Sequence, residues 1–224
     1  MAIRAFLFDF DGLILDTELA SRAGWQMLYR EHGHELPEDL WATLVGTTHA
    51  PWNPMEHLEE LVGRPLDHDV LNERRRTHEL ALIEAEELRP GIVDYLAATR
   101  RHDLKRAIVS SSSRWWVDMH IRRFEEALDW DAICTADGDP VRAKPSPTLY
   151  LEALRLLEVE ADEAVAFEDS PHGVRAAKAA GIYTVAVPNE VTRDLGLDAA
   201  GADLLLDSLA DLPPEELLGR FATA

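Results

Sequence analysis

Two pairs of carboxylates in this chain each follow an apolar run. Asp9 and Asp11 come at the end of the first run, and Glu168 and Asp169 end a later one. Carboxylates this close together destabilise a buried site unless a cation compensates them. Mg²⁺ takes one or two protein carboxylates together with waters and substrate oxygens. The pairs therefore indicate a hard, oxygen-liganded cation, although an Asp-Gly turn after a strand would explain Asp11 without any chemistry.

A serine cluster and one lysine are the next candidates. Serines 110–113 follow another apolar run. Hydroxyls and free backbone N–H groups at a helix start can bind an anion, but serines in this position more often cap the helix. Lys144 lies in the loop sequence AKPSP, whose prolines restrict the backbone. It could bring a positive charge to a carboxylate pair or a phosphoryl group, or it could be an ordinary solvated lysine.

Strands and helices must bring these side chains together in the folded chain. Six short apolar runs predict buried strands, and helical patterns lie between most of them. This alternation predicts an α/β fold, a doubly wound, Rossmann-like parallel sheet whose strands place a ligand crevice at their carboxyl ends. The predicted strands are residues 3–10, 107–110, 131–136, 164–167, 183–187 and 203–206, and the helices between them are residues 92–101, 115–126, 147–157 and 173–180.

The segment of residues 16–88 differs from the rest of the chain. It has helical periodicity but no convincing strand, which predicts an all-helical cap domain inserted between the first two strands. Residues 1–15 and 89–224 would then form the α/β core domain. The insert begins near the first strand–helix turn, where a lid can open and close over a site. Its predicted helices are residues 19–32, 38–45, 55–62 and 69–86.

In order along the chain, these motifs resemble the haloacid dehalogenase superfamily, in its phosphatase and beta-phosphoglucomutase-like branch. The matching segments are FLFDFDGLILDTE, AIVSSSS, AKPSPTLYLEAL and AVAFEDSPHGVRAAKAAGIYTVAVPN. The helical insert matches the cap that this branch carries between its first and second motifs. The resemblance covers nearly the whole chain, and it is far more specific for the branch than for a substrate.

The resemblance implies a catalytic role for each matching residue. Asp9 would be the nucleophile that accepts a phosphoryl group as an aspartyl-phosphate. Asp11 would protonate the leaving oxygen and then activate water. Ser110 and the N–H of Ser111 would bind the phosphoryl oxygens, and Lys144 would neutralise the nucleophile and the phosphoryl group. The dehalogenases of this superfamily lack the second aspartate, so Asp11 argues against dehalogenation.

The resemblance also implies a Mg²⁺ cofactor and its ligands. Asp9, the backbone oxygen of Asp11 and Asp169 would hold the ion, with Glu168 as a further ligand. A bound cation would align the phosphoryl group and reduce its repulsion by the nucleophile.

The cap decides the substrate in this branch, and two cap positions separate the alternatives. The mutase has a histidine where we align Ser21, and an arginine near the segment in which this chain has His49. We therefore expect a phosphatase of a small phosphorylated metabolite, sugar phosphate or phosphoglycolate-like, with His49 as a candidate substrate contact. A phosphomutase is the alternative, and a non-catalytic phosphate-binding protein is disfavoured because every motif residue is present.

The amino-acid composition limits the binding partners and the cellular compartment that we expect. The chain has 42 acidic and 22 basic residues, a net charge of −20, which disfavours nucleic acid and anionic membranes as partners. The single cysteine excludes an internal disulfide and fits a reducing compartment. With neither a signal peptide nor a long apolar span expected, we predict a cytoplasmic protein that is a monomer or a weak homodimer.

Overall fold

The central element is a six-stranded parallel sheet. The computed structural model describes residues 2–44, 52–127 and 129–222. The strand order is β3-β2-β1-β4-β5-β6, and every pair of neighbours is parallel. The sheet confirms the predicted doubly wound fold, with strand ends one or two residues from those expected. The strands are β1 (Ala5–Phe8), β2 (Lys105–Ser110), β3 (Ala132–Thr135), β4 (Ala164–Glu168), β5 (Tyr183–Ala186) and β6 (Leu204–Leu205).

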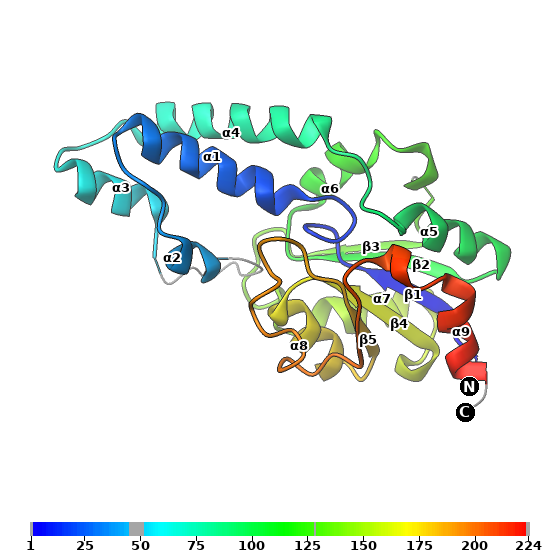
Figure 1. Ribbon diagram of the computed structural model, residues 1–224. Coiled ribbons are helices and arrows are strands. Elements are labelled where there is room, and N and C mark those ends of the chain that lie inside the picture. The colour runs from blue at the N-terminus through cyan, green and yellow to red at the C-terminus, as the bar shows by residue number, and fades with distance from the viewer. Residues whose placement is uncertain (1, 45–51, 128, 223–224) are drawn as a thin grey trace.

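Alternate residues of each strand supply two separate cores. In β1, Phe6 and Phe8 face one side and contact Phe167 of β4. Phe6 meets the Phe167 ring edge-to-face at a centroid distance of 5.2 Å, and Phe8 stacks on it at 4.8 Å. Ala5 and Leu7 face the other side, where small strand residues let helices pack closely. Helices α5 (Ile92–Arg101), α6 (Arg114–Ile121) and α9 (Pro214–Ala222) cover the aromatic face. Helices α7 (Thr148–Leu157) and α8 (Pro171–Ala179) cover the opposite face (Figure 1).

Four helices between β1 and α5 form a layer apart from the sheet (Figure 1). They are α1 (Thr17–Glu31), α2 (Glu38–Ala42), α3 (Pro54–Val62) and α4 (His68–Ala85). Their own core includes Leu28, Tyr29, Trp41, Met55 and Leu58. All four predicted helices are present, and no strand lies among the described residues of this stretch. The limits of residues 16 and 88 remain a prediction of where the cap domain begins and ends.

Two predicted helices end too late and one helix was missed. Helix α2 ends at Ala42 and is followed by a turn at Thr43 and Leu44, whereas residue 45 was the predicted end. Helix α6 ends at Ile121 rather than at residue 126, because its last turn tightens and a 3₁₀ turn, Glu125–Ala127, carries Ala127 into the core. Helix α9 was not predicted, although its start is recognisable: Pro214 opens the helix and Glu215 and Glu216 occupy its first turn. Further 3₁₀ turns are Ala161–Glu163 and Leu209–Asp211. Within the described ranges, no helix combines the length and apolarity needed to cross a membrane.

Candidate active site

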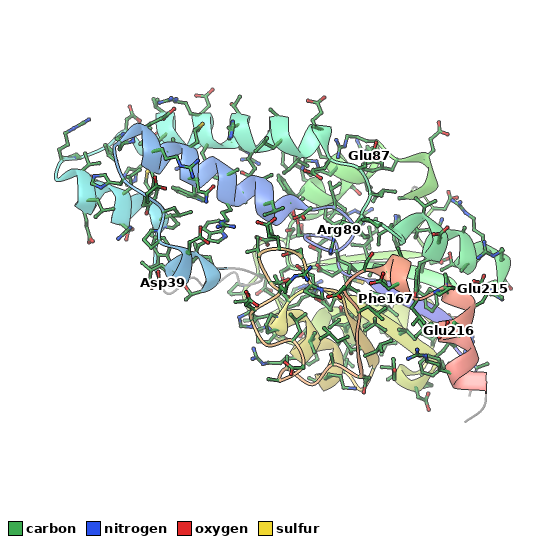
Figure 2. The ribbon with its side chains drawn as sticks, in the orientation of Figure 1. Asp39, Glu87, Arg89, Phe167, Glu215 and Glu216 are labelled. Atoms are coloured by element: carbon green, nitrogen blue, oxygen red, sulfur yellow. The ribbon has the colours of Figure 1, made fainter. Side chains whose placement is uncertain are left out.

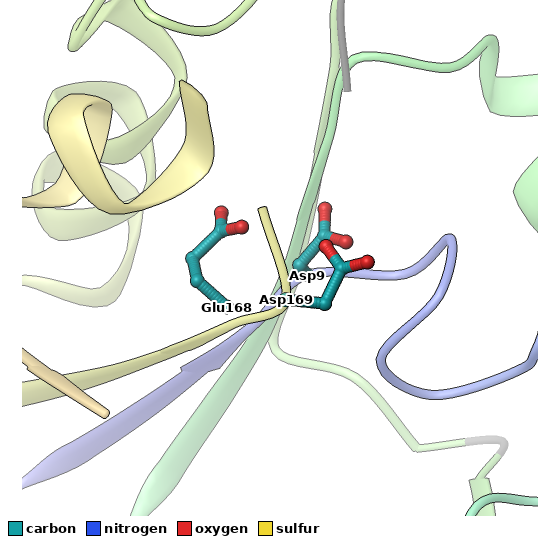
Figure 3. A group of neighbouring side chains, drawn as sticks. All are labelled: Asp9, Glu168 and Asp169. Atoms are coloured by element: carbon teal, nitrogen blue, oxygen red, sulfur yellow. The ribbon is translucent and has the colours of Figure 1, made fainter. Parts of the chain in front are cut away.

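The switch point of the sheet brings three carboxylates together. Strands β1 and β4 are neighbours with Phe8 opposite Phe167, so Asp9 and Glu168 emerge side by side. Asp9, Glu168 and Asp169 are all buried, and each offers an oxygen within 4.8 Å of the others (Figure 3). This is the edge where an open parallel sheet places its ligand crevice. The structure thus assembles two predicted motifs that are about 160 residues apart in sequence.

Lys144 is the cation of this cluster. It lies in the loop between β3 and α7, 4% exposed, and its ammonium donates to Asp9 Oδ1 and lies 2.6 Å from Glu168 Oε1. Burial alone would lower the pKa of Lys144, but Asp9 and Glu168 outweigh burial and hold the pKa above its usual value. Lys144 is therefore a fixed positive charge against Asp9, and its predicted role toward a phosphoryl group remains a prediction.

One lysine does not compensate three buried carboxylates. Burial raises the pKa of Asp9 to about 8, although Lys144 opposes this. The pKa of Asp169 is also well above its usual value, because of burial and then the charges of Asp9 and Glu168. A divalent cation would restore both ionised forms. The donor set therefore fits a Mg²⁺ site in chemistry and in spacing.

Glu168 differs from the other two carboxylates in its contacts. Its Oε1 accepts from the Tyr150 hydroxyl at 2.5 Å and also faces Lys144. Its Oε2 is buried and accepts no hydrogen bond from the described residues. A Cβ added at Gly173, in the first turn of α8, would lie 1.7 Å from that oxygen. Through these contacts the Glu168 carboxylate positions the Lys144 ammonium. The role of Glu168 as a metal ligand remains a prediction.

Gly173→Ala is expected to damage the site, because the added methyl group would displace the Glu168 carboxylate and through it Lys144. Overpacking a buried position costs about 1–3 kcal/mol, which thermal unfolding would detect as a lower Tm together with reduced turnover. Gly219→Ala is the matched control, since a Cβ there meets nothing within 4 Å and alanine favours the interior of α9. Equal Tm values for Gly173→Ala and the wild type would contradict this packing argument.

The Asp11 side chain lies outside the group of three carboxylates. It accepts hydrogen bonds from Thr17 Oγ1 at 2.8 Å, Ser110 Oγ at 3.2 Å, Ser112 Oγ at 2.6 Å and Trp116 Nε1 at 2.7 Å. Four donors occupy about all the lone-pair positions of a carboxylate. If Asp11 reaches a metal, it does so through its backbone oxygen. These four bonds hold its carboxylate in the wall of the cavity, and its role in proton transfer remains a prediction.

Trp116→Phe is expected to lower kcat/KM about tenfold, because a hydrogen bond to a charged group contributes about 1.5–3 kcal/mol and phenylalanine cannot donate it. Trp115→Phe is the matched control: Trp115 is the adjacent residue and is 57% exposed. Steady-state kinetics of the two variants at several pH values would separate a change at Asp11 from a general loss of folded protein. Similar kcat/KM values and pH profiles in both variants would show that the Trp116 bond has no effect on Asp11.

The predicted phosphate-binding serines line the cavity but also bind one another. Ser110 Oγ accepts from the N–H of Ser112 at 3.0 Å and donates to Asp11. Ser111 Oγ accepts from the backbone N–H of Lys144 at 3.1 Å. Ser113 caps α6 by accepting from the N–H of Trp116, so the simple capping explanation holds for that serine. The cluster both starts a helix and faces the site.

A cavity of about 230 Å³ opens above these groups. Its walls come from the strand ends of the sheet and from helices α1 and α4 of the helical layer between β1 and α5. Six of the predicted site residues line it, whereas His49 lies outside the described residues and its role remains a prediction. The lining residues are Asp9, Asp11, Thr17, Glu18, Ser21, Leu44, Glu79, Ser110, Ser111, Ser112, Trp116, Lys144, Asp169 and Ser170.

Sequence reasoning missed the residues that hold the motif loops in place. Arg89, at the junction of the cap and the core (Figure 2), donates to the carbonyl of Gly12 and, at 2.8 Å, to that of Pro188. Asn189 donates to Asp169 Oδ2 at 2.8 Å. The signal for Arg89 was its position beside Pro-Gly at the end of the helical insert. Trp116 and Tyr150 left no signal in the sequence, because their partners are distant in the chain.

Comparison with known proteins shows the family of this chain. The family model of haloacid dehalogenase-like hydrolases matches residues 6–187. The chain therefore belongs to the haloacid dehalogenase-like hydrolase family, as its motifs predicted. Within that family it is a phosphatase: it is 42% identical over 219 residues to YhcW of Bacillus subtilis, which is named as a phosphatase, covering 98% of each chain.

Two further proteins are similar to this chain over most of its length. The phosphorylated carbohydrates phosphatase of Thermotoga maritima is 30% identical over 223 residues, covering 96% of this chain and 97% of that protein. A solved structure of a CbbY variant from Rhodobacter sphaeroides, bound to xylulose 1,5-bisphosphate, has a TM-score of 0.70 and 30% identity. That alignment covers 94% of this chain and 96% of the CbbY chain.

Proposed function

We propose that this protein is a Mg²⁺-dependent phosphomonoesterase that acts on a small phosphorylated metabolite through an aspartyl-phosphate on Asp9. The observation that carries the proposal is the buried Asp9 carboxylate at the floor of the cavity, paired with Lys144 and grouped with Asp169. The Asp9 carboxylate lies at the end of a buried strand and is held by a fixed cation. Such a carboxylate is positioned for in-line attack on a phosphorus atom. The name of the Thermotoga relative supports a phosphorylated carbohydrate as the substrate.

Five motif residues of the cavity then each have a defined task. Asp9 attacks the phosphorus, while Ser110 and the N–H of Ser111 hold the phosphoryl oxygens and Lys144 offsets their charge. Asp11 gives a proton to the leaving oxygen and later takes one from the water that hydrolyses the aspartyl-phosphate.

Mg²⁺ would be held by Asp9, Asp169 and the backbone oxygen of Asp11, with Glu168 as a further candidate. When bound, it supplies positive charge that lowers the repulsion between the nucleophile and the phosphoryl group.

The cap supports hydrolysis over phosphomutation. A mutase must exclude water and present a second hydroxyl of the sugar to the same phosphorus, which requires dedicated donors on the cap. Ser21 of α1 lines the cavity. At the position where the resemblance gives the mutase a histidine, this chain thus has a short hydroxyl that leaves room for water.

Labelled sugar monophosphates, incubated with the enzyme and a catalytic amount of the sugar bisphosphate, distinguish the two functions. We expect inorganic phosphate to accumulate steadily, because water reaches the aspartyl-phosphate. Chromatography of both products gives the two rates. Isomerised sugar phosphate appearing much faster than free phosphate would establish the mutase instead.

A further inference from the structure

A buried amide holds the Asp169 carboxylate from outside the group of three carboxylates shown in Figure 3. Asn189, in the loop after β5, donates from Nδ2 to Asp169 Oδ2 at 2.8 Å. The two residues meet because β4 and β5 are neighbours, with Glu168 opposite Ala186, so the loops that follow these strands lie side by side. Asn189 and Asp169 are each 2% exposed, which shields their hydrogen bond from water. A hydrogen bond to a carboxylate in such surroundings is strong and directional.

The turn of residues 189–192 fixes which end of the amide faces the site. Asn189 Oδ1 accepts from the backbone N–H of Val191 at 2.8 Å and from that of Thr192 at 2.9 Å. The Thr192 hydroxyl donates to the same oxygen at 3.2 Å and accepts from the N–H of Asn189 at 3.0 Å. Because the oxygen is the part of the amide that accepts hydrogen bonds, the NH₂ group must face Asp169.

The loop after β1 leaves room for this contact at Gly12. A Cβ at Gly12 would lie 2.5 Å from Asn189 Nδ2 and closer still to Asp169 Oδ2. The glycine therefore lets the amide and the carboxylate meet. Asn189 Nδ2 also donates to the Gly12 carbonyl at 3.4 Å, and Arg89 donates to the same carbonyl. One amide thus connects Asp169 with the segment that carries Asp11.

Asp169 depends on this amide more than its two neighbours do. Among the described residues, Asn189 is the sole hydrogen-bond donor to the Asp169 side chain. Asp9 and Glu168 are instead held by the Lys144 ammonium. The terminal torsion of an aspartate side chain has broad preferences, so a carboxylate without a partner turns easily. The Asn189 amide is therefore what sets the orientation of the Asp169 carboxylate.

We propose that Asn189 is a positioning residue for Mg²⁺, whose amide N–H orients the Asp169 carboxylate so that it can bind the cation together with Asp9. This role rests on the proposed function, which requires Mg²⁺ at these carboxylates. Asn189 lies beyond residues 6–187, which the family model matches, so the family match assigns it no role. The role belongs to the amide N–H, whereas the amide oxygen holds the turn.

Asn189→Ser removes the donor and keeps the turn. A serine hydroxyl can accept from the backbone N–H groups that follow it, as the asparagine oxygen does, but it is too short to reach Asp169 and adds no charge. Loss of a hydrogen-bond partner behind a metal ligand typically weakens metal binding about 10–100-fold. We expect a Kd for Mg²⁺ raised by that factor, measured by isothermal titration calorimetry with MgCl₂ on metal-free protein.

Thr192→Val is the matched control for the turn. The Thr192 side chain is buried, and its hydrogen bonds among the described residues are all to Asn189. Valine removes them without removing the donor to Asp169. We expect a lower Tm in chelator with a Kd for Mg²⁺ close to that of the wild type. Unfolded protein lowers the fitted stoichiometry rather than the Kd, so the titration separates positioning from stability.

Mg²⁺-dependent release of phosphate from p-nitrophenyl phosphate gives a second readout. In Asn189→Ser the Mg²⁺ concentration for half-maximal rate should rise with the Kd, while kcat at saturating Mg²⁺ approaches the wild-type value, because Asp169 itself remains. Asn189→Thr keeps a turn acceptor in the same way and replaces the serine variant if that protein does not fold.

The possible outcomes separate this role from the function on which it rests. A Kd for Mg²⁺ equal in wild type and Asn189→Ser would overturn the proposal, and Mg²⁺-dependent turnover of the wild type would then leave the phosphatase function intact. Equal weakening in Asn189→Ser and Thr192→Val would assign the effect to the turn and also overturn it. A wild type that neither binds Mg²⁺ nor requires it for turnover would contradict the proposed metal site, and the role of Asn189 would fall with it.

Discussion

Asp9→Asn is expected to reduce turnover by on the order of 10⁴-fold or more, the scale of loss when a catalytic nucleophile is removed. Asparagine has nearly the same shape as aspartate, but its amide does not attack phosphorus. It still offers an oxygen to the Lys144 ammonium that donates to Asp9. Steady-state release of inorganic phosphate from a monoester measures the effect.

The same substitution should leave the fold intact. Burial raises the pKa of Asp9 to about 8, which means that the folded protein disfavours the ionised carboxylate near neutral pH. A neutral asparagine avoids this penalty, so in chelator the Tm of Asp9→Asn should equal or exceed that of the wild type. Asp207→Asn, at a position whose side chain is 81% exposed, is the control for the loss of one charge.

Trapping of the intermediate completes the test of Asp9. Acid-quenched wild-type enzyme should retain label from a ³²P-monoester, and Asp9→Asn should retain none. A folded Asp9→Asn protein with more than about one per cent of wild-type turnover would rule out the covalent mechanism, given the losses seen when nucleophiles are removed.

Removal of divalent metal is expected to abolish turnover, and Mg²⁺ to restore it. Asp9, Glu168 and Asp169 lie within 4.8 Å of one another in a buried cluster, where Lys144 compensates only part of their charge. Ca²⁺ should inhibit, because its longer and looser coordination disfavours the in-line geometry. Activity after exhaustive chelation, with elemental analysis for residual metal, measures the dependence.

Thermal unfolding tests the metal site without relying on activity. A ligand at about 100 times its Kd stabilises the folded state by about 2.7 kcal/mol, so Mg²⁺ should raise the wild-type Tm measurably. In Asp169→Asn the shift should shrink or vanish, since one of the three grouped carboxylates is gone. Full turnover in metal-free enzyme, or equal Tm shifts in both proteins, would show that these carboxylates do not form the proposed site.

The general fold of the core could be predicted from its local patterns. Runs such as AFLF in β1 and AVAF in β4 are apolar on both faces, which is typical of a parallel strand covered by helices on both sides. Helix α5 was predicted with both of its ends correct, because Pro-Gly precedes it. Helix α9 was missed, since a short terminal helix depends on packing against the core more than on its own periodicity.

The meeting of Asp9 and Asp169 at one edge of the sheet was also accessible from sequence. Parallel strands end at one edge of a sheet, so motifs that follow β1 and β4 must meet there whatever their separation in the chain. The side-chain types then limit the chemistry, because buried carboxylates beside one lysine call for a further cation.

The sequence by itself therefore determined the fold class, the family and the identity of the motif residues, since these follow from local periodicity and from the shared edge of a parallel sheet. Only the tertiary structure decided what each side chain contacts. The Trp116 indole reaches Asp11 across 105 residues of sequence, and Tyr150 and Gly173 close around Glu168. The positions of Glu18 and Glu79 in the wall of the cavity likewise depend on how α1 and α4 pack at Gly24. Such contacts follow from the packing of distant segments, which no local pattern in a single sequence encodes.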